Sequence, residues 1–177
     1  LCLENHGVVL FSDDINEIES QITLLQKICQ KDLFSISVLP QNNIPQEIQN
    51  TQYKLLEDSQ INSLVFSDEI YSQLSDLWPI CPDHLVFLGP KPYLYNNTED
   101  LLDSSNQSYQ PPLIFVKNKG IYINKEVFTK IHFIQLQCFV DIILRLDHYD
   151  NVPVIPENEI NKLLNWDAEK YRKDINS

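Results

Sequence analysis

Leu113-Ile114-Phe115-Val116-Lys117-Asn118-Lys119-Gly120-Ile121-Tyr122-Ile123 decides the fold, because it joins two apolar runs through Asn-Lys-Gly. The segment Leu3-Glu4-Asn5-His6-Gly7-Val8-Val9-Leu10 shows the same pattern at an offset of 113 residues, which matches Gly7 to Gly120. A glycine between two strand-like halves marks a bulge, a close approach or a positive φ angle. With only three glycines in the chain, the shared position predicts a structural repeat of strand, tight bend, strand and helix.

A long amphipathic pattern follows each copy. Ser12-Asp13-Asp14 predicts the start of a helix that ends near residue 31 and packs on a sheet. Its apolar residues recur at spacings of three and four: Ile15, Ile18, Ile22, Leu25, Ile28 and Cys29. The second helix is expected over residues 125–146, and apolar residues around most of its circumference predict the most buried helix of the chain.

Weaker patterns lie between and after these helices. They predict a short helix within residues 46–56, strands over 63–66 and 83–88, helices over 67–77 and 157–164, and a short helix within 96–110. Trp166 and Tyr171 are expected to anchor the C-terminal tail.

The fold class expected from these elements is layered α/β, with a mixed or mainly antiparallel sheet covered by the two long helices. Residues 1–35 are expected to complete a domain whose remainder lies upstream, residues 36–60 to form a connector, and residues 61–177 to form a second, repeat-related unit. The chain contains no methionine and opens on an apolar strand, which suggests a cut through a larger protein.

The composition limits the partners. A net charge of -12 argues against nucleic acid and anionic membranes, which require clustered Lys and Arg, although a phosphorylated substrate stays compatible. No apolar run approaches the roughly 20 residues that span a bilayer, and no signal-peptide pattern begins the chain. We therefore expect a cytoplasmic protein. The four cysteines are scattered without a CxxC pair, which favours buried, reduced thiols.

His6 is the candidate metal ligand, because a neutral imidazole beside a tight bend could bind zinc. Residue type alone favours a hydrogen-bonded structural histidine, and His84, His132 and His148 lie too far apart in sequence to form a His-x-His or HExxH pair. The carboxylates lie mostly near expected helix starts, where capping explains them. No nucleophile elbow, P-loop or dinucleotide fingerprint is present.

Residues 3–9 with the following helix resemble the class II aldolase/adducin family. In that family, Asn-His-Gly at the end of a core strand supplies one histidine to a divalent metal that polarises a sugar-phosphate carbonyl. The resemblance implies that His6 is that ligand, usually of zinc, and that Asn5 and Gly7 are candidate substrate-binding residues. Residues 81–90 and 165–172 look like the C-terminal extension of longer bacterial members related to rhamnulose-phosphate aldolases.

The departures from the family concern the catalytic half. Its other two metal histidines, its acid/base glutamate and its phosphate loop all precede Asn-His-Gly, and Lys119 replaces the histidine in the second copy. The catalytic residues are therefore unknown here, and we expect the chain alone to be inactive and to bind metal weakly. The missing N-terminal half is the expected partner, together with a sugar phosphate and a homo-oligomer.

Three hypotheses follow. The chain is the C-terminal part of a metal-dependent lyase that carries out retro-aldol cleavage, an adducin-like interaction or oligomerisation module, or a binding domain for a small sugar acid beside Lys119 and Gly120.

Overall fold

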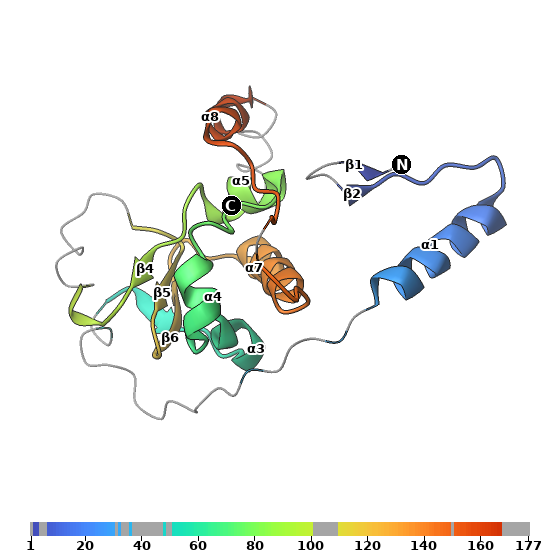
Figure 1. Ribbon diagram of the computed structural model, residues 1–177. Helices are drawn as coiled ribbons and strands as arrows, with labels where there is room; N and C mark the ends of the chain where they lie inside the picture. Colours follow the sequence, from blue (N-terminus) through green and yellow to red (C-terminus); the bar gives the residue numbers. More distant parts are fainter. Residues whose placement is uncertain are drawn as a thin grey trace.

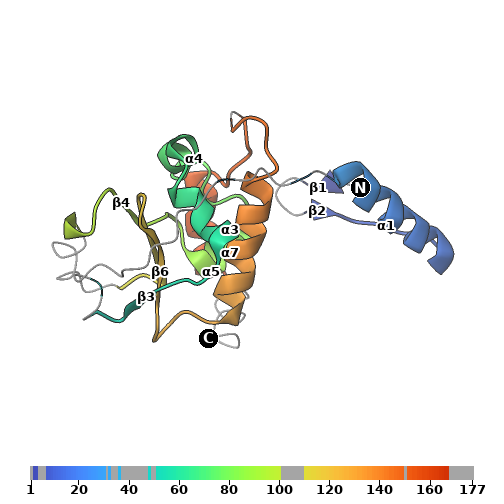
Figure 2. The same ribbon diagram turned by 90° about the horizontal axis from the view of Figure 1, so that it is seen from below.

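The computed structural model describes residues 2–3, 7–30, 32, 36, 48, 51–100, 110–149 and 151–167. These residues form a mixed α/β structure in which helices cover one face of a four-stranded sheet (Figure 1). A short hairpin and the helix after it lie apart from this sheet, beyond α7, in both Figure 1 and Figure 2. The expected α/β class is confirmed.

The sheet is mixed, as expected. Its strands follow the order β3-β6-β5-β4, and their bounds are β3 Tyr53–Leu55, β6 Gly120–Asn124, β5 Leu113–Val116 and β4 Leu94–Tyr95. Strand β6 is antiparallel to both β3 and β5, whereas β4 is parallel to β5. The turn between β5 and β6 contains Asn118 at φ 55° and ends at Gly120 at φ 146°. Both positions use backbone space that asparagine and glycine occupy more readily than other residues.

Side chains alternate between the two faces of the sheet. Phe115 and Ile121 belong to the larger core beneath the helices. Ile114 and Tyr122 lie on the second face, where they pack with Ile48. This alternation follows from the two-residue period of a strand. Because both faces of β5 and β6 are buried, these strands read as continuous apolar runs in the sequence.

Helices of the C-terminal part cover the first face of the sheet (Figure 2). Their bounds are α3 Ser59–Asn62, the 3-10 helix η1 Ser63–Val65, α4 Asp68–Gln73, α5 Pro82–Leu88, α7 Lys130–Ile143 and α8 Glu157–Asn165. Helix α7 buries four apolar residues in the core: Leu136, Phe139, Val140 and Ile143. Its Ile134 and Ile142 are exposed, whereas five of the seven residues of α5 are buried. The prediction that the helix after Gly120 is the most buried was therefore wrong.

The N-terminal part consists of β1 Cys2–Leu3, β2 Gly7–Val8 and α1 Ile15–Cys29. Strands β1 and β2 pair antiparallel. Helix α1 begins as expected, because the Asp14 carboxylate accepts a hydrogen bond from the Asn16 N–H at 2.9 Å. None of its residues is buried. The expectation that this helix packs on a sheet is wrong for the described residues, which place no sheet against its apolar stripe (Figure 1).

Three short segments differ from the sequence predictions. Residues 63–66 were expected to be a strand, but the Asp58 carboxylate accepts the Ile61 N–H at 2.9 Å and starts a helix that continues into η1. Residues 83–88 form α5, which has Pro82 in its first turn. Within 46–56, where a short helix was expected, Ile48 is helical, whereas Tyr53–Leu55 form β3 by pairing with β6. Most of the short helix expected over 96–110 lies outside the described residues.

Two expectations about exposure also fail. Trp166 is 58% exposed, so its ring is not buried as an anchor would be, and Tyr171 lies outside the described residues. Cys29 and Cys138 are free and exposed, and Cys81 is half-buried. Cys29 is exposed because α1 has no covering layer, and Cys138 lies on the outward side of α7. The predicted buried thiols are therefore not found among the described side chains.

Candidate functional site

The strongest candidates from the sequence belong to the Asn-His-Gly segment, residues 5–7. Asn5 and His6 lie outside the described residues. Gly7 begins β2 and pairs with Leu3 of β1, so the Asn-His-Gly sequence leads into a strand of a hairpin. The role of His6 as a metal ligand stays a prediction.

His84 is a core residue. Its ring is 1% exposed and lies against Trp78, with ring centroids 3.8 Å apart, and against Phe139 at 4.7 Å. Its Nδ1 accepts a long hydrogen bond of 3.4 Å from the Ile80 N–H, and its Nε2 has no partner. Burial lowers the pKa of His84 from 6.5 to about 3. The ring is therefore neutral at physiological pH and enclosed by hydrocarbon.

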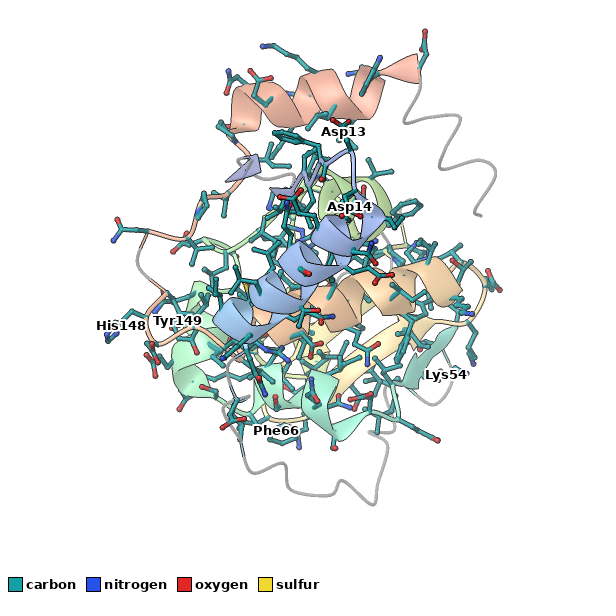
Figure 3. All side chains as sticks on the ribbon, turned by 90° about the vertical axis from the view of Figure 1, so that its right-hand side faces the viewer. Asp13, Asp14, Lys54, Phe66, His148 and Tyr149 are labelled. Atoms are coloured by element: carbon teal, nitrogen blue, oxygen red, sulfur yellow. The ribbon has the colours of Figure 1, made fainter. Side chains whose placement is uncertain are left out.

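The other two described histidines have local roles. The His132 ring accepts a hydrogen bond from the Thr129 N–H at 3.1 Å. In return, the Thr129 side chain accepts a hydrogen bond from the His132 backbone N–H. This reciprocal pair caps the helix. His148 is exposed at the edge of the molecule (Figure 3). In the part of the chain that the structure describes, no three His, Cys, Asp or Glu side chains are close enough to hold a metal ion.

The bend at Gly120 explains why glycine occurs in the second copy. A Cβ at this position would lie 2.4 Å from a Leu55 methyl group and 3.2 Å from the Asn62 amide oxygen. That oxygen accepts the Ile121 N–H at 2.7 Å, while the Asn62 amide nitrogen donates to the Leu56 carbonyl at 2.6 Å. Both predicted reasons for glycine, close approach and positive φ, are confirmed here. Leu55 and Asn62 therefore fill the space that a side chain at position 120 would need.

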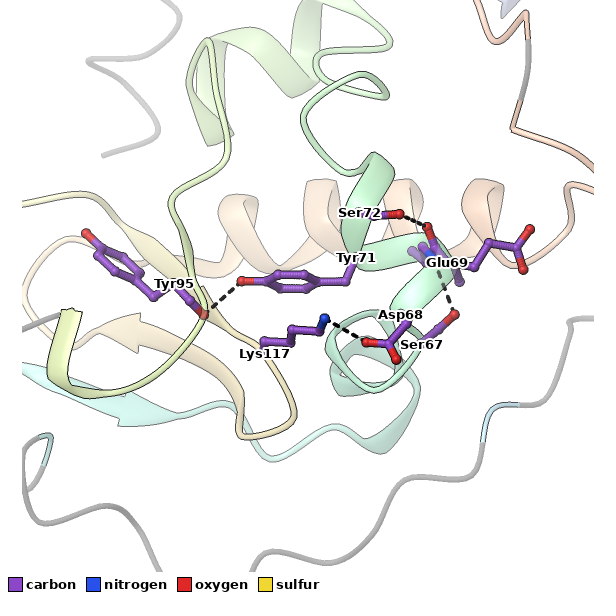
Figure 4. A network of polar contacts seen from close by, with 8 residues as sticks. Ser67, Asp68, Glu69, Tyr71, Ser72, Tyr95 and Lys117 are labelled. Carbon is purple, nitrogen blue, oxygen red and sulfur yellow. Dashed lines mark hydrogen bonds and ion pairs between the residues drawn. The ribbon is translucent and has the colours of Figure 1, made fainter.

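A polar network joins the same hairpin to α4 (Figure 4). The Lys117 ammonium lies 2.7 Å from the Asp68 carboxylate and 5.7 Å from the centre of the Tyr71 ring. The Tyr71 hydroxyl donates to the Tyr95 carbonyl at 2.9 Å. Burial raises the pKa of Tyr71 to about 12, against the opposing effect of its backbone hydrogen bonds. The Tyr71 phenol therefore stays protonated, and its proton is used in the hydrogen bond to the Tyr95 carbonyl. The network fixes the β5–β6 hairpin to α4 and does not present Tyr71 as an acid or base.

The Cys138 thiol is not an activated nucleophile. Burial raises the pKa of the Cys138 thiol, and the nearby Cys81, Asp141 and Asp83 raise it further. A raised pKa lowers the thiolate fraction, which is the reactive form. Cys138 is therefore less reactive than an ordinary thiol.

Exposed apolar side chains gather in residues 8–28, and they are the clearest candidate for a functional surface. Of the eleven large apolar residues that are exposed in the described part of the chain, seven lie in this segment: Val8, Val9, Phe11, Ile15, Ile22, Leu24 and Ile28. Phe11 and Ile15 are 74% and 70% exposed. Exposed apolar surface that is clustered in this way marks an interaction site. The helical spacing in the sequence identified the stripe, but it could not show that none of its residues on α1 is buried.

No protein-family model matches this chain, and neither a curated protein nor a solved structure was found to be similar to it. In the described residues, no helix has the length and apolar character needed to cross a membrane.

Proposed function

We propose that this chain is the C-terminal part of a metal-dependent class II aldolase-like protein that cleaves a carbon–carbon bond of a sugar phosphate by a retro-aldol reaction. In this proposal His6 is one ligand of a divalent metal, zinc, and Asn5 and Gly7 lie beside the substrate. When bound, the metal supplies a Lewis acid at the substrate carbonyl. The remaining ligands and the proton-transfer group belong to an N-terminal half, so the 177 residues alone are inactive.

One observation supports the proposal: the segment that carries Asn-His-Gly is also the segment with the exposed apolar surface. Val8 and Val9 directly follow the motif and are 47% and 44% exposed, and the helix behind them buries none of its residues. Soluble proteins rarely leave this much clustered apolar surface in water. A larger α/β core that covers residues 8–28 would also hold His6 beside other elements.

Activity of the longer protein tests the function. We would express the reading frame that includes the sequence upstream of Leu1 and assay retro-aldol cleavage on a panel of sugar phosphates, with zinc and after chelation. His6→Ala is expected to abolish the metal-dependent rate. His148→Ala is the matched control, because that ring is exposed and outside any cluster among the described residues. Unchanged activity of His6→Ala, or no metal-dependent cleavage at all, would overturn the proposal.

The second candidate is an adducin-like, non-catalytic interaction module. Two titratable side chains of the C-terminal part favour it, because neither is accessible to a substrate. The Tyr71 hydroxyl donates to the Tyr95 carbonyl, and His84 is buried in the core. In this case the apolar surface would serve assembly alone. A stable oligomer that keeps its affinity after His6→Ala, together with no activity of the longer protein, would decide for this candidate.

A further inference from the structure

Helix α1 carries a narrow apolar seam along its whole length. The residues of this α1 seam lie alternately three and four positions apart: Ile15, Ile18, Ile22, Leu25 and Cys29. None of them is buried, and the side chains of Ile15 and Ile22 are 70% and 43% exposed. The spacing is that of the a and d positions of a heptad repeat.

The positions that flank the seam indicate what kind of partner it fits. A helix that packs on a sheet or into a globular core usually has a wider stripe, with apolar residues along one flank as well. The flanks of the α1 seam carry the polar residues Glu19, Gln21 and Gln26, together with the apolar Ile28. A seam of a and d positions between mainly polar flanks is typical of a helix that pairs with another helix.

A second copy of α1 has the matching spacing. From Ile15 to Leu25 the steps along the seam are three, four and three residues, which read the same in both directions. Two antiparallel copies therefore match position for position. Ile15 meets Leu25 of the second copy, Ile18 meets Ile22, and the same two pairs recur on the other side of a two-fold axis. Such an interface is closed, because each copy offers the same surface to the other.

Charge favours the antiparallel arrangement over the parallel one. Within residues 7–30, the carboxylates belong to the first half of the segment: Asp13, Asp14, Glu17 and Glu19. Asp13 and Asp14 lie at the N-terminal end of α1 (Figure 3). At the other end, Lys27 lines a surface pocket of about 460 Å³ together with Arg145, which follows α7. Antiparallel copies bring the carboxylate end of each helix to the cationic end of the other, whereas parallel copies bring like charges together.

We infer that α1 is a self-association surface, through which two copies of this chain pair by their α1 seams, antiparallel and about a two-fold axis. The inference concerns residues 15–29 and needs neither His6 nor a metal. It leaves Val8 and Val9, beside the Asn-His-Gly motif, for the core of the proposed function. A helix of 15 residues is about 22 Å long, so the seam buries less than the about 800 Å² per partner of a standard interface. We therefore expect a weak dimer, with a dissociation constant in the micromolar range.

Sedimentation velocity on the full 177-residue chain measures the association across the micromolar range. A salt concentration of about 0.15 M screens charges beyond about 8 Å, which limits the repulsion between two chains of net charge -12. Ile22→Glu and Leu25→Glu should each weaken the dimer at least about tenfold, because the two-fold pairing places the new charge in the seam twice. Leu24→Glu is the matched control. It adds the same charge at an exposed leucine outside the seam, and it should leave the association within about twofold.

Cross-linking with a short bis-maleimide tests the orientation. Cys29 is free and exposed. In the antiparallel pair the two copies of Cys29 lie about 27 Å apart along the axis, whereas in a parallel pair they face each other. Position 21 lies beside the two-fold axis. Two copies of the Gln21→Cys chain should therefore be joined at position 21 and not at Cys29, as mapped by mass spectrometry.

The outcomes separate the inference from the proposed function. A chain that stays monomeric throughout this range overturns the inference, and so does a dimer that is indifferent to Leu25→Glu. Cross-links between the two Cys29 thiols overturn the antiparallel pairing. A dimer that Leu25→Glu weakens, in a longer protein without aldolase activity, refutes the function and leaves the self-association surface standing. Circular dichroism checks that the variants fold, and none of the substituted side chains is buried.

Discussion

Lowering the pH from 7 to 5 should reduce the free energy of unfolding by about 2 kcal/mol through His84 alone. The reason is the enclosure of this ring by Trp78 and Phe139, which leaves its Nε2 without a partner and excludes water. Burial of this kind penalises the charged imidazolium, and it lowers the pKa of His84 from 6.5 to about 3.

The sign follows from which state binds the proton first. As the pH falls through 6.5, His84 is protonated in the unfolded chain but stays neutral in the folded chain. The stability contributed by the neutral ring is therefore fully present above pH 6.5 and is lost progressively between pH 6.5 and about 3. Over that whole range the loss amounts to about 5 kcal/mol, and about 2 kcal/mol of it falls between pH 7 and 5.

Urea unfolding at pH values from 5 to 8 measures the effect. His84→Leu removes the titrating ring but keeps an apolar side chain, and His148→Gln is the control because His148 is exposed. The difference in stability between pH 7 and 5 should be about 2 kcal/mol smaller in His84→Leu than in the natural chain, and unchanged in His148→Gln. Any packing cost of the leucine cancels, since each variant is compared with itself at two pH values.

Two results would refute this reasoning. One is an equal pH dependence of stability in His84→Leu and in the natural chain. The other is an NMR titration of the folded protein in which the His84 ring takes up its proton near pH 6.5.

Three further substitutions test contacts in the sheet. Tyr122→Phe should be neutral or stabilise the protein by up to about 2 kcal/mol in chemical denaturation, because the buried Tyr122 hydroxyl has no hydrogen-bond partner. The matched control Tyr53→Phe should destabilise by about 1 kcal/mol, since the Tyr53 hydroxyl donates to the Pro111 carbonyl at 2.9 Å. Gly120→Ala should lower the thermal midpoint more than Gly89→Ala: both have positive φ, but only Gly120 has a side-chain atom 2.4 Å from the added methyl. Asn62→Leu should destabilise by about 1 to 3 kcal/mol in urea, because it leaves the buried Ile121 N–H without its side-chain acceptor. It also removes the amide donor to the Leu56 and Asp58 carbonyls, which keep only their backbone partners. A loss close to zero would show that water replaces these bonds.

The parts of the fold that the sequence predicts well are those with two agreeing local signals. The β5–β6 hairpin combines two apolar runs with Asn118 and Gly120 at the bend. Helix α1 combines a 3.6-residue period with an Asp14 cap. Residues 63–66 and 83–88 show only short apolar runs, which do not distinguish a buried strand from a buried helix. Their helical state is decided by the caps before them, at Asp58 and at Cys81-Pro82.

The candidate site shows a different limit of the sequence. His6 in Asn-His-Gly suggests one metal ligand. The other ligands of such a site are brought together by tertiary contacts, and no His-x-His or HExxH spacing in this chain identifies them. The apolar residues of α1 recur with the period of a helix. An exposed helix and a helix packed on a sheet show the same period, so the sequence pattern does not distinguish them. Exposure of Ile15 and Ile28 is a tertiary property, and only coordinates reveal it.

The strand order β3-β6-β5-β4 has a consequence for synthesis on the ribosome. Both central strands are made after both outer strands, so β3 and β4 leave the exit tunnel before any partner exists for them. The apolar residues of α5 must likewise wait for α7, which is made later still. Nascent chains halted before residue 124 should therefore be captured by chaperones and cut readily by proteases, and resistance should arise in a single late step once α7 has emerged.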